Sequence, residues 1–177
     1  VGLAYSVYKR GVPSFIVCDA SSNTVTFCVI KGRIIGAIDA PIFAPGLTQG
    51  PLDVEAIRAV DAGRMAANQA FNCGGILNKI GRSTLEECSQ EERMLAVESL
   101  ALFASMEINA MLVLSRDWHE AHPELFLAGS PAPLLVERVA DLLGRDVRAL
   151  DRYEAARGCA LIARDVFEGC ERILGLE

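Results

Sequence analysis

Three short segments rich in β-branched and aromatic residues lie within the first 39 residues, and they constrain the fold more than any other feature. They are residues 15–19, 24–30 and 33–39. A polar stretch, residues 20–23, separates the first two, and the dipeptide Lys31-Gly32 separates the last two. Connections this short join neighbouring strands as hairpins. We therefore expect an antiparallel three-stranded meander.

The rest of the chain alternates between helical and extended patterns. Ser89 and Glu92 form a capping box ahead of a long apolar helix whose hydrophobic residues occupy more than one face. Helices are predicted over residues 54–60, 65–71, 91–114, 133–143 and 154–167, and strands over residues 124–128 and 146–150. These patterns predict an α/β fold in which further strands extend the meander and helices cover both faces.

Two regions of the sequence indicate how the chain is divided into domains and loops. The chain begins with Val1, and the first convincing strand starts only near Phe15. We expect residues 1–13 to be a linker or the end of a missing N-terminal lobe, and residues 14–177 to be the C-terminal lobe of a longer protein. Prolines and glycines make residues 41–51 a loop, and the glycine-rich joints after it predict a compact region that wraps over the sheet.

Composition excludes several classes of partner. The net charge of −6 argues against nucleic acid. The apolar segment 95–114 is interrupted by polar residues such as Glu98 and Glu107, so we expect a buried helix rather than a membrane span. The six cysteines have irregular spacings and form no C-x-x-C pair. We therefore expect neither a disulfide nor a zinc site, and a reducing, cytoplasmic location.

Two loops contain the residue types that bind phosphate. Residues 19–24, Asp-Ala-Ser-Ser-Asn-Thr, follow a strand and offer backbone N–H groups and hydroxyl donors, and Asp19 could hold a metal-bound water. Gly129 and Ser130 follow another strand and precede a helix, where phosphate is favoured. Each loop alone also fits an ordinary turn without a ligand. We predict that the two loops lie on one edge of the sheet and face each other across a cleft.

Two further segments are less specific. Asp53 and Arg58 follow a Gly-Pro loop, where Arg58 could grip a phosphate or carboxylate. Helix capping by Asp53 and surface ion pairs explain this charge equally well. In the last helix, small residues surround Gly158, and a glycine inside a helix costs about 1 kcal/mol relative to alanine. Gly158 therefore predicts a close approach to another backbone.

Taken in order, these segments resemble the acetate kinase–sugar kinase–actin superfamily. FIVCDASSNTVTFCVIKGRIIGAIDA resembles its phosphate motif, LFLAGSPAP its adenosine motif and EAARGCALIA the helix that joins its two lobes. The phrases DASSNTVT, GAIDA, GPLDVEAIR and AARGCALIARD are similar to the archaeal family called methanogenesis marker protein 12, which is acetate/butyrate kinase-like. The resemblance implies a ribonuclease H-like, actin-like ATPase-type lobe.

The resemblance also implies ATP or ADP with Mg²⁺, bound between two lobes. The residues that would cradle the phosphates are Asp19, Ser21, Ser22, Asn23 and Thr24. Asp19 would reach the metal through a water, and Gly129 and Ser130 would face the adenosine. Arg58 and Asp53 are the candidate catalytic residues, with Arg58 steadying charge.

One departure from the resemblance bears on catalysis. Acetate and butyrate kinases begin this hairpin with a histidine and a glycine-containing turn. Alignment on residues 24–26 places Cys18 at the histidine and Ser22 at a glycine. The adenosine motif usually has two glycines, whereas here Ala128 precedes Gly129. A thiol cannot supply the charge of an imidazole, so the resemblance to acyl kinases is weaker for chemistry than for fold.

Three readings of function follow. The leading one is a nucleotide-binding protein of methanogenic archaea that transfers a phosphoryl group to a carboxylate, or uses hydrolysis to drive a change in a partner. On that reading an isolated lobe is expected to be inactive. The alternative is a non-catalytic assembly or regulatory module that retains the fold. The third is a homodimer-building lobe that pairs through the apolar helix 91–114.

Overall fold

The computed structural model of the chain describes all residues from 1 to 177 and contains a five-stranded mixed sheet in the order β3-β2-β1-β4-β5. The strands are β1 (Phe15–Ala20), β2 (Thr24–Ile30), β3 (Arg33–Asp39), β4 (Glu124–Ala128) and β5 (Arg148–Ala149). Strands β1, β2 and β3 pair antiparallel, whereas β4 runs parallel to β1 and β5 parallel to β4. The predicted meander and its extension are confirmed, with β5 shorter than expected.

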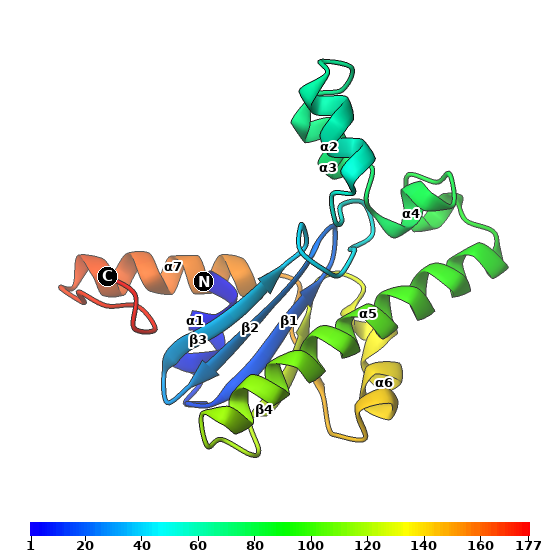
Figure 1. Cartoon of the computed structure of the whole chain (residues 1–177). Helices are drawn as coiled ribbons and strands as arrows, with labels where there is room; N and C mark the ends of the chain where they lie inside the picture. The colour runs from blue at the N-terminus through cyan, green and yellow to red at the C-terminus, as the bar shows by residue number, and fades with distance from the viewer.

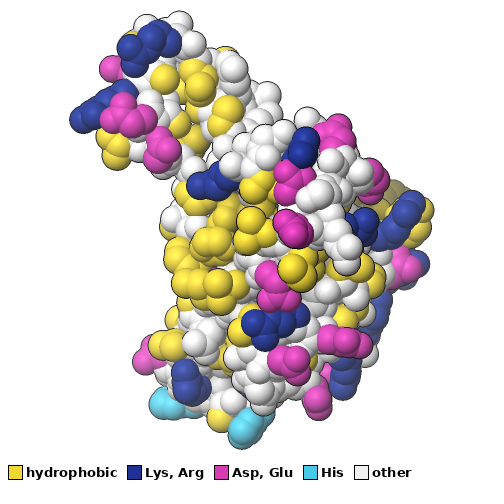
Figure 2. All heavy atoms as spheres, turned by 90° about the vertical axis from the view of Figure 1, so that its right-hand side faces the viewer, with side chains coloured by type: hydrophobic (Ala, Val, Ile, Leu, Met, Phe, Trp, Pro, Cys, Tyr) yellow, Lys and Arg dark blue, Asp and Glu magenta, His cyan; other side chains and the backbone are white.

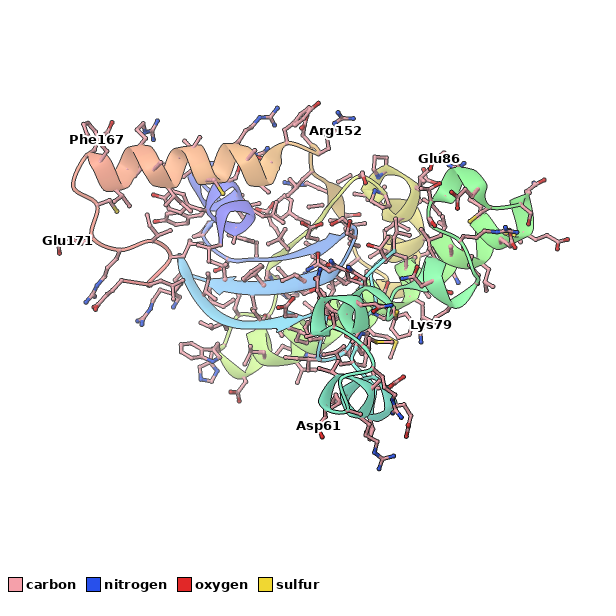
Figure 3. The ribbon with its side chains drawn as sticks, turned by 90° about the horizontal axis from the view of Figure 1, so that it is seen from above. Asp61, Lys79, Glu86, Arg152, Phe167 and Glu171 are labelled. Atoms are coloured by element: carbon pink, nitrogen blue, oxygen red, sulfur yellow. The ribbon has the colours of Figure 1, made fainter.

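Alternation along β1 sorts its side chains between two cores. Ile16 and Cys18 pack in the core on one face, and Phe15 and Val17 pack in the core on the other. Successive side chains of a strand point to opposite faces. All four are fully buried, because helices cover both faces of the sheet as predicted (Figures 1 and 3).

Helices α1 (Gly2–Lys9) and α7 (Glu154–Phe167) pack against each other on one face of the sheet (Figure 1). Helix α1 buries Leu3 and Val7 in the same core as Phe15. Residues 2–9 thus form a helix that belongs to this core, where the sequence indicated only a linker or the end of an earlier element. The assignment of residues 1–13 to another lobe stays a prediction.

Helices α1 and α7 cross most closely at Gly2 and Gly158, and we call this contact the glycine crossing. A Cβ placed on Gly158 would lie 1.7 Å from the Gly2 carbonyl oxygen. A Cβ placed on Gly2 would lie 2.7 Å from Cys159 Sγ. No larger residue fits at position 158 without moving the backbones apart, so the predicted packing reason for Gly158 is confirmed.

Helices α5 (Gln90–Asp117) and α6 (Ala132–Leu143) cover the opposite face. Ser89 caps α5, because its Oγ accepts from the Glu92 main-chain N–H and the Glu92 carboxylate accepts from the Ser89 N–H. By length and composition, α5 is the one helix long and apolar enough to cross a membrane. In this structure it packs against the sheet as a core helix.

A short-helix region follows β3. It contains α2 (Val54–Asp61), α3 (Ala67–Asn72), α4 (Ile76–Lys79) and a 3-10 turn, η1 (Leu85–Glu87). Helices α2 and α3 form an arm that projects away from the sheet (Figure 1). The expectation that this region wraps over the sheet is therefore wrong for the arm. The physical reason is that α2 packs on α3 rather than on the sheet: it buries none of its residues, and its apolar Val54 and Ile57 stay more than half exposed.

Candidate functional site

A pocket of about 320 Å³ opens where β1 and β4 end. These strands are parallel neighbours, and Asp19 is in register with Ala128, so the turns after them meet at one edge of the sheet. The residues that line this edge pocket are Leu3, Asp19, Ser21, Ala128, Gly129, Ser130, Asp151, Arg152, Glu154 and Ala155. The expectation that the two loops lie on one edge is confirmed, and Asp19, Ser21, Gly129 and Ser130 of these loops line the same pocket.

Gly129 brings the two turns into contact. Its φ of +99° lies in the region that favours glycine. A Cβ at this position would lie 2.9 Å from each of Asp19 Oδ1, the Ala20 carbonyl oxygen and Ser21 Cβ. Only glycine leaves space for both turns, and its backbone remains accessible from the edge pocket.

Asp19 presents an unusual group at this contact. Its Oδ1 atom is buried and has no hydrogen-bond partner. Burial raises the pKa of Asp19, and a hydrogen bond from Ser21 opposes this effect. A buried acceptor without a donor is costly, so such an atom often marks a place where water, a cation or a ligand completes the set. Asp19 therefore fits the predicted role of holding a water of bound Mg²⁺.

Three other predicted phosphate ligands lie elsewhere. Thr24 is fully buried, and its hydroxyl donates to the Pro45 carbonyl oxygen at 3.0 Å. Ser22 and Asn23 do not line the edge pocket. Residues 21–23 form a tight turn in which the Ser21 N–H donates to the Asn23 carbonyl oxygen at 3.0 Å, and we call it the phosphate turn after the ligand that the sequence predicts for it. The structure thus brings Asp19 and Ser21 to the pocket with Gly129 and Ser130, and gives Thr24 a structural role.

The two candidate catalytic residues lie on the arm. The Asp53 carboxylate accepts from the Ala56 N–H at 2.7 Å and caps α2. Arg58 pairs with Glu55 at 2.7 Å on an exposed helix surface. Figure 3 places Asp61, at the end of α2, on the opposite side of the sheet from Arg152 of the edge pocket. Asp53 and Arg58 are therefore outside this pocket, and their catalytic role stays a prediction.

Cys18 also lies outside the pocket. Its side chain is fully buried in the core beneath α5. Burial raises the pKa of its thiol, and Thr26 opposes this only in part. Cys18 is therefore an inert core residue at the position that the resemblance aligns with a kinase histidine.

The junction between β5 and α7 contributes pocket residues that the sequence did not single out. Arg152 is one, and its guanidinium lies over the Tyr153 ring, 4.7 Å from the centroid. Glu154 is another, and it pairs with Arg10 and accepts from Ser6. Burial alone would raise the pKa of Glu154, but Ser6 and Arg10 outweigh it and lower the pKa. The pocket wall on this side therefore carries an ionised carboxylate.

No family model matches the chain. It is 43% identical over 185 residues to a UPF0285 protein of Methanosarcina barkeri, covering all of this chain and 57% of that protein. It is 38% identical over 193 residues to a UPF0285 protein of Methanocaldococcus jannaschii, covering all of this chain and 58% of that protein. The chain therefore spans less than two thirds of the length of these relatives.

Solved structures agree on the fold. The acetate kinase of Porphyromonas gingivalis superposes with a TM-score of 0.57 at 14% identity, over 94% of this chain and 52% of that one. A propionate kinase of Francisella tularensis superposes with a TM-score of 0.53 at 14% identity, over 88% of this chain and 51% of that one. The resemblance to marker protein 12 stays a prediction. The chain has the fold of the acetate kinase–sugar kinase–actin superfamily, and its homologues are UPF0285 proteins of methanogens.

Proposed function

We propose that this chain is one lobe of a two-lobed nucleotide-binding protein, and that the edge pocket receives the phosphates of a magnesium nucleotide. The observation that carries the proposal is the buried, unpartnered Asp19 Oδ1 beside the Gly129 turn. A carboxylate oxygen held there suits the water shell of Mg²⁺. The neighbouring kinases with this fold, acetate kinase and propionate kinase, support a phosphate-handling role.

Each residue of the pocket has a distinct part in the proposal. Asp19 orients a metal-bound water, and Ser21 donates its hydroxyl to a phosphate oxygen. Gly129 and Ser130 offer main-chain N–H groups at the start of α6, where the helix dipole attracts anions. Mg²⁺ would neutralise charge on the phosphates when bound. In phosphoryl transfer, positioning and electrostatics supply most of the catalysis.

The reaction class that fits best is transfer of a phosphoryl group to a carboxylate, or hydrolysis coupled to a change in a partner. Transfer to a carboxylate needs a second lobe opposite the edge pocket. Water must be excluded from the phosphate during transfer to another acceptor. We therefore expect the 177 residues alone to bind nucleotide weakly.

Calorimetry of the full-length protein tests this proposal. Asp19→Asn is expected to weaken Mg-ADP binding at least about tenfold while changing metal-free ADP binding less, because the carboxylate acts through the metal. Ser130→Ala keeps the main-chain N–H and removes a hydroxyl that acts on the nucleotide without the metal, so it is expected to weaken both equally. Asp61→Asn, at an exposed position on the arm, is the matched control and is expected to change neither. Unchanged affinity for Mg-ADP in the Asp19 variant would overturn the proposal.

A second candidate function is a non-catalytic assembly module, and two observations favour it. Cys18 is buried where the kinases resembled here carry a histidine. Helix α5 also exposes an apolar stripe, the α5 stripe, formed by Leu95, Leu102, Met106 and Val113. Figure 2 shows apolar side chains gathered on that side of the molecule below the arm. A patch of this kind typically marks a protein interface.

The α5 stripe is complementary to itself when two copies run antiparallel. A twofold axis beside the middle of the helix would set Leu102 against Met106 of a second copy, and Leu95 against Val113. Light scattering is expected to give a dimer of the 19.0 kDa chain. Leu102→Lys should give the monomer.

A matched variant on another helix separates this interface from a general loss of apolar surface. Leu134 of α6 is also about half exposed. Leu134→Lys is expected to leave the dimer intact, because Leu134 lies outside the α5 stripe. A monomeric wild-type chain at high micromolar concentration, or equal effects of the two variants, would contradict the α5 interface.

A further inference from the structure

The phosphate turn is fixed by a neighbouring loop as well as by its own hydrogen bonds. The main-chain amides of Leu47 and Gln49 each donate to a carbonyl oxygen of that turn at 2.8 Å. Gly46 packs so closely that a Cβ there would lie 2.4 Å from Asn23 Cα. We call residues 44–49 the clasp loop. Its position determines the position of the phosphate turn.

Glu107 of α5 lies beneath the beginning of the clasp loop. Its side chain has no exposed surface. The Thr26 hydroxyl donates to Glu107 Oε2 at 2.6 Å, whereas Oε1 is buried without a hydrogen-bond partner. Thr24 and Thr26 lie on the same face of β2, so one hydroxyl holds the clasp loop through Pro45 and the other holds Glu107.

No cation compensates this carboxyl, which forms none of the ion pairs of the structure. The groups that face it are the Asp39 carboxylate at the end of β3, the Cys18 thiol of β1 and the main-chain amide of Ala44. Burial raises the pKa of Glu107 to about 7, and the Thr26 hydroxyl and the Ala44 amide oppose this only in part. An ionised carboxylate in such a place lacks the water or cation that it needs.

Opening of the clasp loop would let water reach Glu107 Oε1. Opening would also withdraw the Ala44 amide, which favours the ionised form, but burial is the larger influence on the pKa of Glu107. The closed loop therefore holds the proton on Glu107 more tightly than an open loop does. By linkage, loss of that proton must favour the open loop. Because the clasp loop donates to the phosphate turn, the turn loses hydrogen bonds when the loop opens.

We propose that Glu107 is a positioning residue for the edge pocket: when its carboxyl ionises, the clasp loop loosens, the phosphate turn loses its support and affinity for the nucleotide phosphates falls. The inference rests on the proposed function for the identity of the ligand. The coupling between Glu107 and the clasp loop does not need a ligand, so it can be tested by itself.

Hydrogen exchange of the unliganded full-length protein measures that coupling. Protection factors of the Leu47 and Gln49 amides are expected to fall about fivefold between pH 6 and pH 8, at the low end of coupling between sites. Glu107→Gln keeps the shape and cannot ionise, so its protection should stay constant. Glu91→Gln, an exposed position on the same helix, should behave like wild type. Equal pH profiles for wild type and Glu107→Gln would overturn the inference.

Calorimetry with Mg-ADP then tests the effect on binding. The affinity of wild type relative to Glu107→Gln is expected to fall about fivefold from pH 6 to pH 8. The comparison between variants cancels the titration of the nucleotide itself. If wild type binds Mg-ADP and this ratio stays constant, the inference fails and the proposed function stands. If wild type binds no Mg-ADP at any pH, the proposed function fails, and the exchange experiment alone decides the coupling.

A second pair of variants covers the case in which Glu107→Gln does not fold. Thr26→Val removes the donor to Glu107 Oε2 and disfavours the ionised form, so the loss of protection should move to higher pH. Thr26→Ser retains the hydroxyl and should restore the wild-type profile. If the Thr26→Val and Thr26→Ser proteins lose amide protection at the same midpoint pH, the role of Glu107 is contradicted.

Discussion

The two faces of the sheet bury carboxylates in opposite ways. On the α7 side, Asp165 accepts from the Tyr5 hydroxyl at 2.6 Å and pairs with Lys9 at 2.9 Å. Hydrogen bonds from Tyr5, Lys9 and Arg164 hold its pKa well below the ordinary range. On the α5 side, Glu107 has one donor and no cation, and burial raises its pKa to about 7. Neighbours, rather than burial alone, decide the sign of the shift.

This difference separates two uses of a buried acid. The partnered carboxylates of the α7 side connect α1 to α7 and stabilise the packing of both helices. On the α5 side, Glu107 has few partners, and its protonation is coupled to the position of the clasp loop. The α1–α7 contact, which we expect to be rigid, and the Glu107 contact, which we expect to respond to pH, therefore lie on opposite faces of the same strands. Each can be tested by a substitution.

The largest effect is expected at the glycine crossing of the α7 side. Gly158→Ala should lower the free energy of unfolding by about 4 kcal/mol, because the new methyl group overlaps the Gly2 carbonyl. Helix propensity alone would give a gain of about 1 kcal/mol. Chemical denaturation measures the difference. Ala160→Gly, at an exposed position of α7, is the control and should lose only about 1 kcal/mol. A more stable Gly158→Ala protein would show that α1 and α7 are not packed rigidly.

The next effect concerns the pH dependence of stability on the α5 side. The pKa of Glu107 is raised in the folded state, so its contribution to stability is complete at acidic pH and is lost as pH rises through 7. The loss is on the order of 3 kcal/mol between pH 5 and pH 8. Glu107→Gln should remove this part of the pH dependence in urea titrations. If the difference in unfolding free energy between wild type and Glu107→Gln does not change with pH, Glu107 is in contact with water.

The smallest effect is a single hydrogen bond of the α7 side. Tyr5→Phe removes the donor to Asp165 and should cost about 1 kcal/mol at neutral pH. Because the pKa of Asp165 is lowered, this cost should decrease in acid, where the carboxylate becomes protonated. Tyr8→Phe in the same helix is the control, since Tyr8 is more exposed. Equal losses at pH 7 and in strong acid would contradict a hydrogen bond from Tyr5 to an ionised Asp165.

The sequence predicted the elements whose stability is local. The meander followed from alternation and short turns, and α7 has the bounds expected for it, Glu154–Phe167. Helix α1 was not recognised, because its stability comes from packing on α7 more than 140 residues away. The arm was misplaced for a related reason. Its apolar residues have helical spacing, but nothing in that spacing says whether a core lies beneath them.

The site was predicted in part. Asp19 and Gly129 were found because each lies in a turn of small residues after a strand. Arg152 and Glu154 were missed, since they reach the pocket only through the fold of the β5–α7 junction. Glu107 was read as an interruption of an apolar helix. Its spacing of seven and three residues from the buried Leu100 and Ala104 was the signal that places it on the same buried face.

The pairing of α1 with α7 also bears on how the protein is made. Residues at the two ends of the chain meet in hydrogen bonds that span 148 and 160 residues of sequence. A ribosome releases α1 well before α7, so Leu3 and Val7 lack this partner while the residues between the two helices are made. Long-range contacts of this kind slow folding. The nascent chain therefore exposes the apolar face of α1 until α7 emerges, and apolar surface exposed in this interval favours aggregation.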